Sequence, residues 1–462
     1  MQEFFFMCQP GQLSILACVL LGWMGMLTEQ VPAVDTRPNY VFLMADDLGW
    51  GDVAFHGGNA PTPHLDRLAR EGLELTQHYV APVCSPTRAA LLTGRYWSRF
   101  DITIPINTQA LPHETVTLAR ALQEAGYATC LTGKWHLGSL PRQGPNGFGF
   151  DHAYGSLAGG VSPWNHRYKQ GPFSETWHRN GTLVEETGHV TDLLANEAIH
   201  WLRQRDSQQP FFLYVPFTAV HLPVKEPVEW VNRVPRNITG NVARHYAASI
   251  MHLDDSVGRI LETLEQLGQR RNTLVVFTSD NGASSAENND PKYPADKCPD
   301  GRLTGSNRPF RGEKATLYEG GIRVPTLVSW PGQVKPGKVA TPVQIADWMP
   351  TLCALADIQP SKDLKWDGID LTPVLTQHAP LPERPLYAVA PKWRGRSVRL
   401  GNWKLIVQTQ DQQQQIELFD MATDPGESRN QAQNQPERVK NMLRLLEDIA
   451  QRDRDAVVAP PE

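Results

Sequence analysis

Short apolar runs alternate with helical patterns along most of this chain, and charged side chains stand where several of the runs end. Tyr40 to Ala45 is one such run, and it stops at Asp46 and Asp47. A continuous apolar run of this length is typical of a strand that is buried on both faces of a parallel sheet. This alternation constrains the fold more than any other feature, because it predicts repeated strand-helix-strand units.

Three further units repeat the pattern, each with a helical segment, a predicted strand and then polar residues. We therefore predict a doubly wound, mostly parallel α/β sheet flanked by helices. Side chains beyond the carboxyl ends of parallel strands meet at one edge of the sheet, where such folds bind their ligands. The predicted helices are 117–126, 190–203 and 243–267, the predicted strands are 127–131, 211–215 and 274–278, and the polar residues after them are Lys134, His136, His221, Asp280 and Asn281.

The pattern changes after about residue 380. Residues 397–400, 403–407 and 416–419 are short strand-like runs, and 436–452 is a closing helical pattern. Neighbouring short strands with tight turns favour antiparallel pairing. We expect residues 35–380 to form the catalytic α/β domain and residues 381–462 to form a smaller C-terminal antiparallel α+β subdomain.

The first 34 residues have the features of a secretory signal peptide. The apolar run from Leu13 to Leu27 is 15 residues long, shorter than the roughly 20 residues of a typical membrane-spanning helix. Small residues at Val31 to Ala33 suit a signal peptidase. We expect export to a periplasmic, secreted or lysosome-like compartment, and the alternative is an uncleaved membrane anchor.

Charge and cysteine content exclude several classes of partner and site. The chain has 44 Lys plus Arg against 49 Asp plus Glu and a net charge of −5, so it lacks the basic balance of a nucleic-acid-binding protein. Beyond the leader, no pair of cysteines has the C-x-x-C spacing of a zinc ribbon or a thioredoxin-type site. Whether Cys130, Cys298 or Cys353 forms a disulfide stays open, as does the oligomeric state.

The predicted strand ends offer a set of oxygen ligands. Asp46, Asp47, Asp280 and Asn281 provide only oxygen atoms, and three of the four side chains are anionic. Such a set suits a hard cation, Ca²⁺ or Mg²⁺, rather than zinc. An isolated Asp-Asp or Asp-Asn pair is more often a turn or a helix cap, but two pairs after two strands favour a metal site. Spacing does not choose between the two metals.

Cys84 begins the segment Cys84-Ser85-Pro86-Thr87-Arg88, which is typical of a helix start. We expect Ser85 to cap the helix and Pro86 to take its first position. Cys84 would then lie at a helix N-terminus, where free N–H groups favour negative charge, and Arg88 would face the same side. A lone cysteine is usually a small buried hydrophobe, so the surrounding motif decides the interpretation.

That motif resembles the first signature of the formylglycine-dependent (type I) sulfatases. Other segments match the same family in its order along the chain, from about residue 39 to residue 430. Within the family the sequence is most similar to arylsulfatase B-type enzymes that act on sulfated sugars. The matching segments are Ala45 to Asp47, Cys84 to Arg88 with Leu92 to Arg95, Thr132 to Gly138, His221 with Pro223 and Pro227, Ser279 to Gly282, Phe310 to Lys314, Glu319 to Pro325, Leu418 to Asp420 and Asp424 with Pro425.

The resemblance implies a fold, a cofactor and a reaction. The fold is the alkaline-phosphatase-like α/β fold, and the reaction is hydrolysis of sulfate esters on a sugar or polysaccharide, such as a glycosaminoglycan. Cys84 would be oxidised to formylglycine by a maturation enzyme, and the hydrated aldehyde would attack sulfur. This is covalent catalysis that divides one difficult step into two.

The resemblance also implies roles for individual residues. A calcium ion, with magnesium as the alternative, would be held by Asp46, Asp47, Asp280, Asn281 and the modified Cys84. Arg88 would orient the nucleophile, and Lys134 and Lys314 would neutralise the sulfate. His136 would act as the base that releases sulfate, and His221, with Lys314, as the proton donor to the leaving alcohol.

One segment departs from the family pattern. Where arylsulfatase B-like chains carry Tyr-Ser-His, this chain has Trp164-Asn165-His166. Asn165, His166 and Ser162 are therefore the alternatives for a side chain that contacts the substrate. Two other functions stay open on the sequence alone: a phosphoester or phosphonate hydrolase of the same superfamily, and an inactive protein that binds sulfated glycans.

Overall fold

The computed structural model describes residues 37–289, 293, 297–359, 364–410 and 413–457. The predicted signal peptide lies outside these residues. Among the helices that are described, none combines the length and apolar character needed to cross a membrane. The sheets and helices below all belong to one compact unit.

Strand β1 (Asn39–Ala45) shows why the central sheet has helices on both faces. All seven of its residues are buried. Side chains alternate between the two faces of a strand, so Tyr40, Phe42 and Met44 pack into one hydrophobic cluster. Val41 and Leu43 pack into a second cluster on the opposite face. A continuous apolar run is the sequence signature of a strand that must fill two cores.

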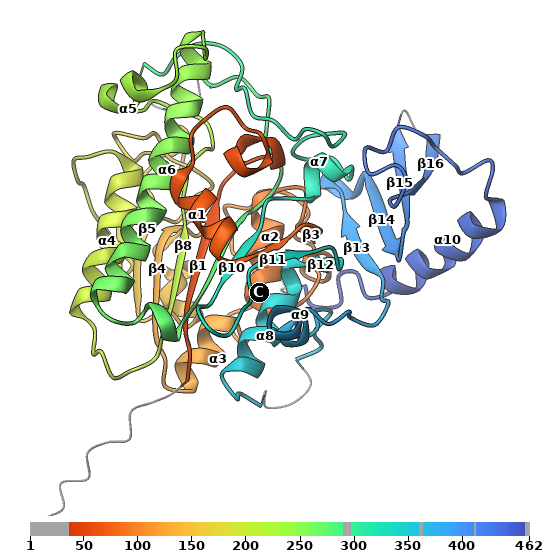
Figure 1. The fold of residues 1–462 in the computed structure, drawn as a ribbon, viewed down its shortest axis with the longest axis horizontal. Coiled ribbons are helices and arrows are strands. Elements are labelled where there is room, and N and C mark those ends of the chain that lie inside the picture. The colour runs from red at the N-terminus through yellow and green to blue at the C-terminus, as the bar shows by residue number, and fades with distance from the viewer. Residues whose placement is uncertain (1–36, 290–292, 294–296, 360–363, 411–412, 458–462) are drawn as a thin grey trace, which may run out of the picture. The chain divides into compact units, whose positions relative to one another are not determined.

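The central sheet has ten strands in the order β11-β2-β10-β9-β1-β8-β4-β5-β6-β7 (Figure 1). Its middle is parallel: β1 pairs with β8 and β9, and β4 pairs with β8 and β5. Antiparallel pairs lie toward the two edges, at β10 and at β6. The strands besides β1 are β2 (Leu73–Leu75), β4 (Ala128–Lys134), β5 (His152–Ser156), β6 (Trp177–Arg179), β7 (Thr182–Leu183), β8 (Phe211–Pro216), β9 (Thr273–Ser279), β10 (Leu327–Ser329) and β11 (Gly337–Val339).

The helices divide between the two faces, and a short two-stranded sheet lies beside them. One cluster draws residues from α2, α3, α8 and α9, and the other from α1, α4 and α6. The helices are α1 (Pro63–Glu71), α2 (Cys84–Thr93), α3 (Leu118–Glu124), α4 (Val190–Gln204), α5 (Val228–Arg233), α6 (Asn241–Gln266), α7 (Glu319–Ile322), α8 (Trp348–Leu355), α9 (Thr372–Gln377) and α10 (Pro436–Ala450), and the small sheet pairs β3 (His78–Tyr79) with β12 (Val343–Gln344).

The predicted α/β fold is confirmed, and the main strands lie where the sequence pattern puts them. The segment 243–267, for which one or two helices were possible, is the single helix α6. The pattern did not reveal the short strands toward the sheet edges, such as β6 and β7. Strands of two or three residues leave too little periodicity to detect, and they depend on their neighbours in the sheet for hydrogen bonds.

A four-stranded antiparallel sheet follows near the C-terminus, drawn in blue in Figure 1. Three of its strands match the predicted runs, and Leu386 begins a fourth that the pattern missed. Its apolar face packs against α10 through a separate core that includes Leu405, Leu418 and Leu446. The strands are β13 (Leu386–Val389), β14 (Gly395–Leu400), β15 (Trp403–Gln410) and β16 (Gln413–Asp420).

Lys404 of β15 connects this sheet to the segment that precedes β10. Its Nζ lies 2.9 Å from Oε1 of Glu319 and 2.8 Å from Oε1 of Glu427, and both carboxylates are fully buried. Tyr79 donates a hydrogen bond of 2.7 Å to the other oxygen of Glu319. A buried cation shared by two acids is costly to remove, because the acids then lose their compensating charge.

We expect Lys404→Ala to lower the free energy of unfolding by about 3 to 5 kcal/mol, the usual cost of breaking a buried ion pair. Burial raises the pKa of Glu427 to about 7 although Lys404 acts to lower it, so at about pH 8 urea denaturation of the wild type starts from the ionised acid. Lys440→Ala is the matched control, because Lys440 is exposed on α10, and it should change stability by no more than about 0.5 kcal/mol. Equal effects of the two substitutions would contradict this account.

Candidate active site

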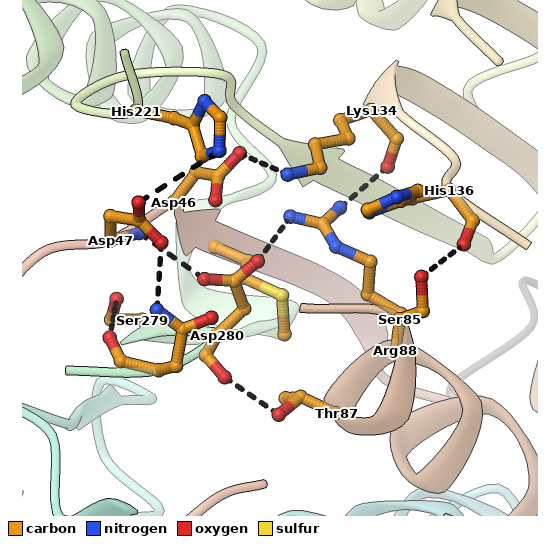
Figure 2. Close-up of polar contacts among 12 residues, drawn as sticks. Asp46, Asp47, Ser85, Thr87, Arg88, Lys134, His136, His221, Ser279 and Asp280 are labelled. Atoms are coloured by element: carbon orange, nitrogen blue, oxygen red, sulfur yellow. Dashed lines mark hydrogen bonds and ion pairs between the residues drawn. The ribbon is translucent and has the colours of Figure 1, made fainter. Parts of the chain in front are cut away.

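The polar residues that follow the central strands come together at one edge of the sheet. Asp46 and Asp47 follow β1, Lys134 ends β4, and Asp280 follows β9. Neighbouring parallel strands carry their carboxyl ends to the same edge, so residues more than 200 positions apart become contacts. Figure 2 shows these side chains pointing toward one another above the ends of the strands.

Cys84 is buried at the first position of α2, whose ten residues are all buried. Ser85 is not the cap and Pro86 is not the first helical residue that the sequence predicts: the helix begins two residues earlier, at Cys84, and Val83 takes the cap position without a side-chain bond. The Ser85 hydroxyl instead donates to the carbonyl of His136 over 2.8 Å. Burial raises the pKa of the Cys84 thiol, although the nearby Lys134 and Lys314 act in the opposite direction.

Arg88 lies one turn beyond Cys84 and joins two strand ends. Its guanidinium donates to Oδ2 of Asp280 over 2.7 Å and to the carbonyl of Lys134 over 2.5 Å. Neither Arg88 nor Asp280 has any exposed side-chain surface. A fully buried pair of this kind holds its geometry tightly, because either charge alone would be strongly disfavoured.

Lys134 forms the second buried ion pair of the site. Its Nζ lies 2.5 Å from Oδ2 of Asp46, and both side chains have no exposed surface. Burial, followed by repulsion from Asp280, raises the pKa of Asp46. Burial and the neighbouring acids therefore disfavour the charged form of Asp46, and additional positive charge nearby would stabilise it.

Lys314 forms the third ion pair, with Asp47. Its Nζ lies 2.6 Å from Oδ1 and 2.8 Å from Oδ2 of that carboxylate. Nε2 of His221 lies 3.9 Å from Oδ2. Although burial acts to raise the pKa of Asp47, Lys314 and His221 hold it well below its usual range. Burial and the two nearby lysines keep the pKa of His221 well below its ordinary value.

Two of the four predicted oxygen ligands, Asp46 and Asn281, leave an oxygen that suits a divalent cation. Asn281 donates its Nδ2 to Oδ1 of Asp47 over 2.7 Å, which leaves its Oδ1 directed elsewhere. Among the atoms that the structure describes, Oδ1 of Asp46 and Oδ1 of Asn281 are buried and accept no hydrogen bond. Ligand atoms of Asp46, Asp47 and His221 lie within 4.8 Å of one another. Buried oxygens without a donor are an unfavourable arrangement that a hard cation satisfies.

His136 packs against Gly159, a residue that the sequence analysis did not single out. The imidazole is almost completely buried, and neither ring nitrogen has a hydrogen-bond partner within the described part of the chain. A Cβ atom at position 159 would lie 2.3 Å from its Nε2. Glycine is therefore needed to let the ring occupy this place. Burial, with the charges of Lys134 and Arg88, lowers the pKa of His136 well below its ordinary value.

The structure places Asn165 and His166 on a separate loop. His166 is buried, shares a hydrogen bond of 3.0 Å with the carbonyl of Gly188, and stacks on the ring of Trp177. Oδ1 of exposed Asn165 accepts the backbone N–H of Arg167 over 2.9 Å. These contacts tie Asn165 to its own loop and His166 to β6 and the segment before α4, and the predicted role of both in binding substrate stays a prediction.

Two hydroxyl groups complete the frame of the site. Thr87 donates to the carbonyl of Asp280 over 2.6 Å, and Ser279 donates to the carbonyl of Asn281 over 2.9 Å while accepting the N–H of Leu48. Both residues lie inside the matching motifs, so the sequence indicated that they lie near the site. It did not indicate that their hydroxyls hold distant segments together, because those contacts depend on the fold.

Comparison with known proteins identifies the family. The sulfatase family profile matches residues 38–358, and a second profile, N-sulphoglucosamine sulphohydrolase, C-terminal, matches residues 311–454. The chain belongs to the sulfatase family. It is therefore a sulfuric ester hydrolase, in agreement with the resemblance that its motifs carry.

Characterised relatives and a solved structure cover most of this sulfatase. N-acetylgalactosamine-6-sulfatase of Rattus norvegicus is 35% identical in an alignment of 413 positions that covers 83% of this chain and 74% of the relative. Arylsulfatase of Klebsiella aerogenes is 30% identical, over 80% of this chain and 95% of the relative. The crystal structure of Ps i-CgsB in complex with k-i-k-neocarrahexaose matches with a TM-score of 0.81 and 30% identity, covering 92% of this chain and 95% of that one.

We expect Gly159→Ala to lower kcat/KM by about 100-fold, the scale of loss that a displacement of about 1 Å can cause at a catalytic group. The added methyl group would push the His136 ring out of place, while the ring itself can turn and let the protein fold. Activity toward an aryl sulfate checks the predicted loss of kcat/KM, and the thermal unfolding temperature checks that the variant folds.

Gly147→Ala is the control for this substitution. A Cβ at position 147 would meet only one atom within 4 Å, the carbonyl oxygen of Arg142, at 4.0 Å. This variant should keep the activity of the wild type. If Gly159→Ala did so as well, the contact with His136 would have no part in catalysis.

Proposed function

We propose that this sulfatase hydrolyses sulfate esters of a sulfated sugar or polysaccharide through a formylglycine made from Cys84. The observation that carries the proposal is the set of three acid-base pairs, two of them fully buried, around the N-terminus of α2. Asp46, Asp47 and Asp280 are each paired with a cation, Lys134, Lys314 and Arg88 respectively. Formylglycine, when hydrated, supplies a hydroxyl nucleophile at this position and a second hydroxyl whose ionisation allows sulfate to leave.

A Ca²⁺ ion, with Mg²⁺ as the alternative, would be held by Asp46, Asp47, Asp280 and Asn281, with the modified residue 84 beside it. The orphaned oxygens of Asp46 and Asn281 support this assignment. When bound, the ion supplies positive charge that polarises a sulfate oxygen and lowers the pKa of the nucleophile. The three paired carboxylates offset the three paired cations, so a bound divalent ion would make the site positive and attract an anionic ester.

The remaining polar groups surround the place where a sulfate group would lie. Arg88 would orient the nucleophile, since two buried partners fix its guanidinium. Lys134 and Lys314 would donate to sulfate oxygens as negative charge develops during S–O cleavage. His136 would take a proton in the step that releases sulfate, and His221 would give a proton to the departing alcohol.

The relatives favour a carbohydrate substrate. One relative is named N-acetylgalactosamine-6-sulfatase, and the matching crystal structure is a complex with k-i-k-neocarrahexaose. Asn165, His166 and Ser162 lie on the loop that we propose contacts the sugar. The panel of sulfated mono- and disaccharides below tests the identity of the glycan and the position of the sulfate, and longer sulfated oligosaccharides would distinguish exo from endo action.

We further propose the same division of the chain as the sequence favours, with residues 35–380 carrying the chemistry and residues 381–462 forming the C-terminal subdomain. Residues 1–34 would direct export to a periplasmic, secreted or lysosome-like compartment. The partner required for activity is a formylglycine-generating maturation enzyme that reads the Cys84 to Arg88 segment.

The first test compares wild type and Cys84→Ala, both co-expressed with a maturation enzyme. The wild type should hydrolyse 4-nitrophenyl sulfate and at least one member of a panel of sulfated mono- and disaccharides. Cys84→Ala should lose at least about 1,000-fold in kcat, because covalent catalysis is no longer possible. Ion chromatography of the released sulfate measures hydrolysis of both the aryl sulfate and the sulfated sugars.

The same samples are assayed with 4-nitrophenyl phosphate and a phosphonate monoester. Turnover of these esters in preference to every sulfate would favour the phosphoester hydrolase. Tight binding of sulfated sugars without turnover of any ester would favour the inactive binding protein. Either result would replace the proposed function.

Removal of the metal provides a second test. Chelation followed by dialysis should abolish turnover and lower the thermal unfolding temperature, because the buried acids would lose a stabilising ligand. Adding back Ca²⁺ or Mg²⁺ separately identifies the ion that restores both properties. Full activity after complete chelation, verified by elemental analysis, would contradict the proposal that the four oxygen ligands hold a metal ion needed for turnover.

A further inference from the structure

A second buried network of acids and imidazoles lies outside the residues assigned to the chemistry. Nδ1 of His252 is 2.8 Å from Oε2 of Glu226, and its Nε2 is 3.3 Å from Oδ1 of Asp192. Nε2 of His189 lies 3.6 Å from the same oxygen of Glu226. The four residues come from α6, the segment after β8, and the start of α4, so the network joins three parts of the fold.

The network is charged and dry at its centre. His252 has no exposed side-chain surface and Glu226 has 3%. Although burial acts to lower the pKa of His252, the neighbouring carboxylates of Asp192 and Glu226 raise it to about 9. The rings of His189 and Trp230 stack on His252, with centroids 5.0 and 4.8 Å away. Two acids therefore hold one imidazolium in a fixed orientation.

Glu226 belongs to the segment that carries His221. Near its start, this segment is fixed by backbone hydrogen bonds with Asp46: Asp46 N–H donates to the carbonyl of Ala219 over 2.9 Å, and Val220 N–H donates back over 2.8 Å. Toward its far end, buried Asn288 accepts the N–H of Val224 over 2.6 Å and donates to its carbonyl over 3.1 Å, and the backbone N–H of Glu226 donates to Nδ1 of His245 over 2.9 Å. His221 lies between the attachment to Asp46 and these, and a small cavity is lined by His189, His221 and Glu226 together.

We infer that Glu226 is a positioning residue for His221, held in place by the side chain of His252 and, behind it, Asp192. The inference rests on the proposed role of His221 as proton donor to the leaving alcohol. A proton donor must lie within hydrogen-bond reach of the departing oxygen. Loosening the far end of its segment should therefore weaken proton transfer before it weakens binding of the sulfate, which other residues hold.

Hydrogen bonding describes this network better than a bound metal does. Two ligands of a tetrahedral zinc ion lie roughly 3.3 Å apart, given bonds of about 2.0 to 2.1 Å, whereas Glu226 and His252 approach to 2.8 Å. Nδ1 of His189 accepts the N–H of Thr191 over 3.3 Å. Because Nδ1 of His189 is used in this way, only its Nε2 faces Glu226, at 3.6 Å.

The test measures dependence on the leaving group in matured wild type, Glu226→Gln and His221→Ala. Phenyl sulfate needs a proton on its leaving oxygen more than 4-nitrophenyl sulfate does. Glu226→Gln should lower kcat/KM for phenyl sulfate at least about 10-fold more than for 4-nitrophenyl sulfate, a part of the full effect of a general acid. His221→Ala should show the same selectivity more strongly.

Two further variants make the result specific. Asp192→Asn removes the outer acid and should shift the selectivity in the same direction by a smaller factor. Glu229→Gln changes an exposed acid three residues from Glu226 and should leave both rates unchanged. Asp192→Asn keeps the test decisive if Glu226→Gln fails to fold.

The outcomes separate this inference from the proposed function. If His221→Ala shows the selectivity while Glu226→Gln and Asp192→Asn lower both rates equally or not at all, the positioning role is wrong. If His221→Ala shows none, the proton-donor role itself fails. Loss of one metal equivalent in Glu226→Gln, by elemental analysis against wild type, would also overturn the inference, because the network would then be a metal site.

Discussion

The ion pair between Arg88 and Asp280 is the contact on which the rest of the site depends. Neither side chain reaches solvent, so each charge is tolerable only because the other is present. Arg88 also holds the carbonyl of Lys134, and Asp280 accepts the N–H of Asp47 over 3.2 Å. One pair thereby connects helix α2, which carries Cys84, to the carboxyl ends of β1, β4 and β9.

Burial explains why this arrangement suits sulfate chemistry. Water would screen the three cations and weaken their hold on an anion, but in a dry pocket the same charges act at close to full strength. The acids hold the cations in place, so in the proposed mechanism little reorganisation would be needed when charge moves onto the sulfate. The network of Glu226 and His252 extends this principle to the loop that carries His221.

The sequence was sufficient to predict the sheet and the residues at its edge, because strand periodicity and the residues after each strand are local features. Contacts between distant segments were not available from it. The pairing of Lys314 with Asp47 spans 267 positions, and the fit of Gly159 against His136 depends on how two loops meet. Ser85 was predicted as a cap from local preference, but the helix began earlier and its hydroxyl found a partner on another strand end.

The most direct test of the account is mass spectrometry of the tryptic peptide from Glu71 to Arg88, which contains Cys84, in protein matured to different extents. The account predicts that the fraction of peptide with the mass of formylglycine rises in proportion to sulfatase turnover. Full turnover in protein whose Cys84 remains an unmodified thiol would contradict it.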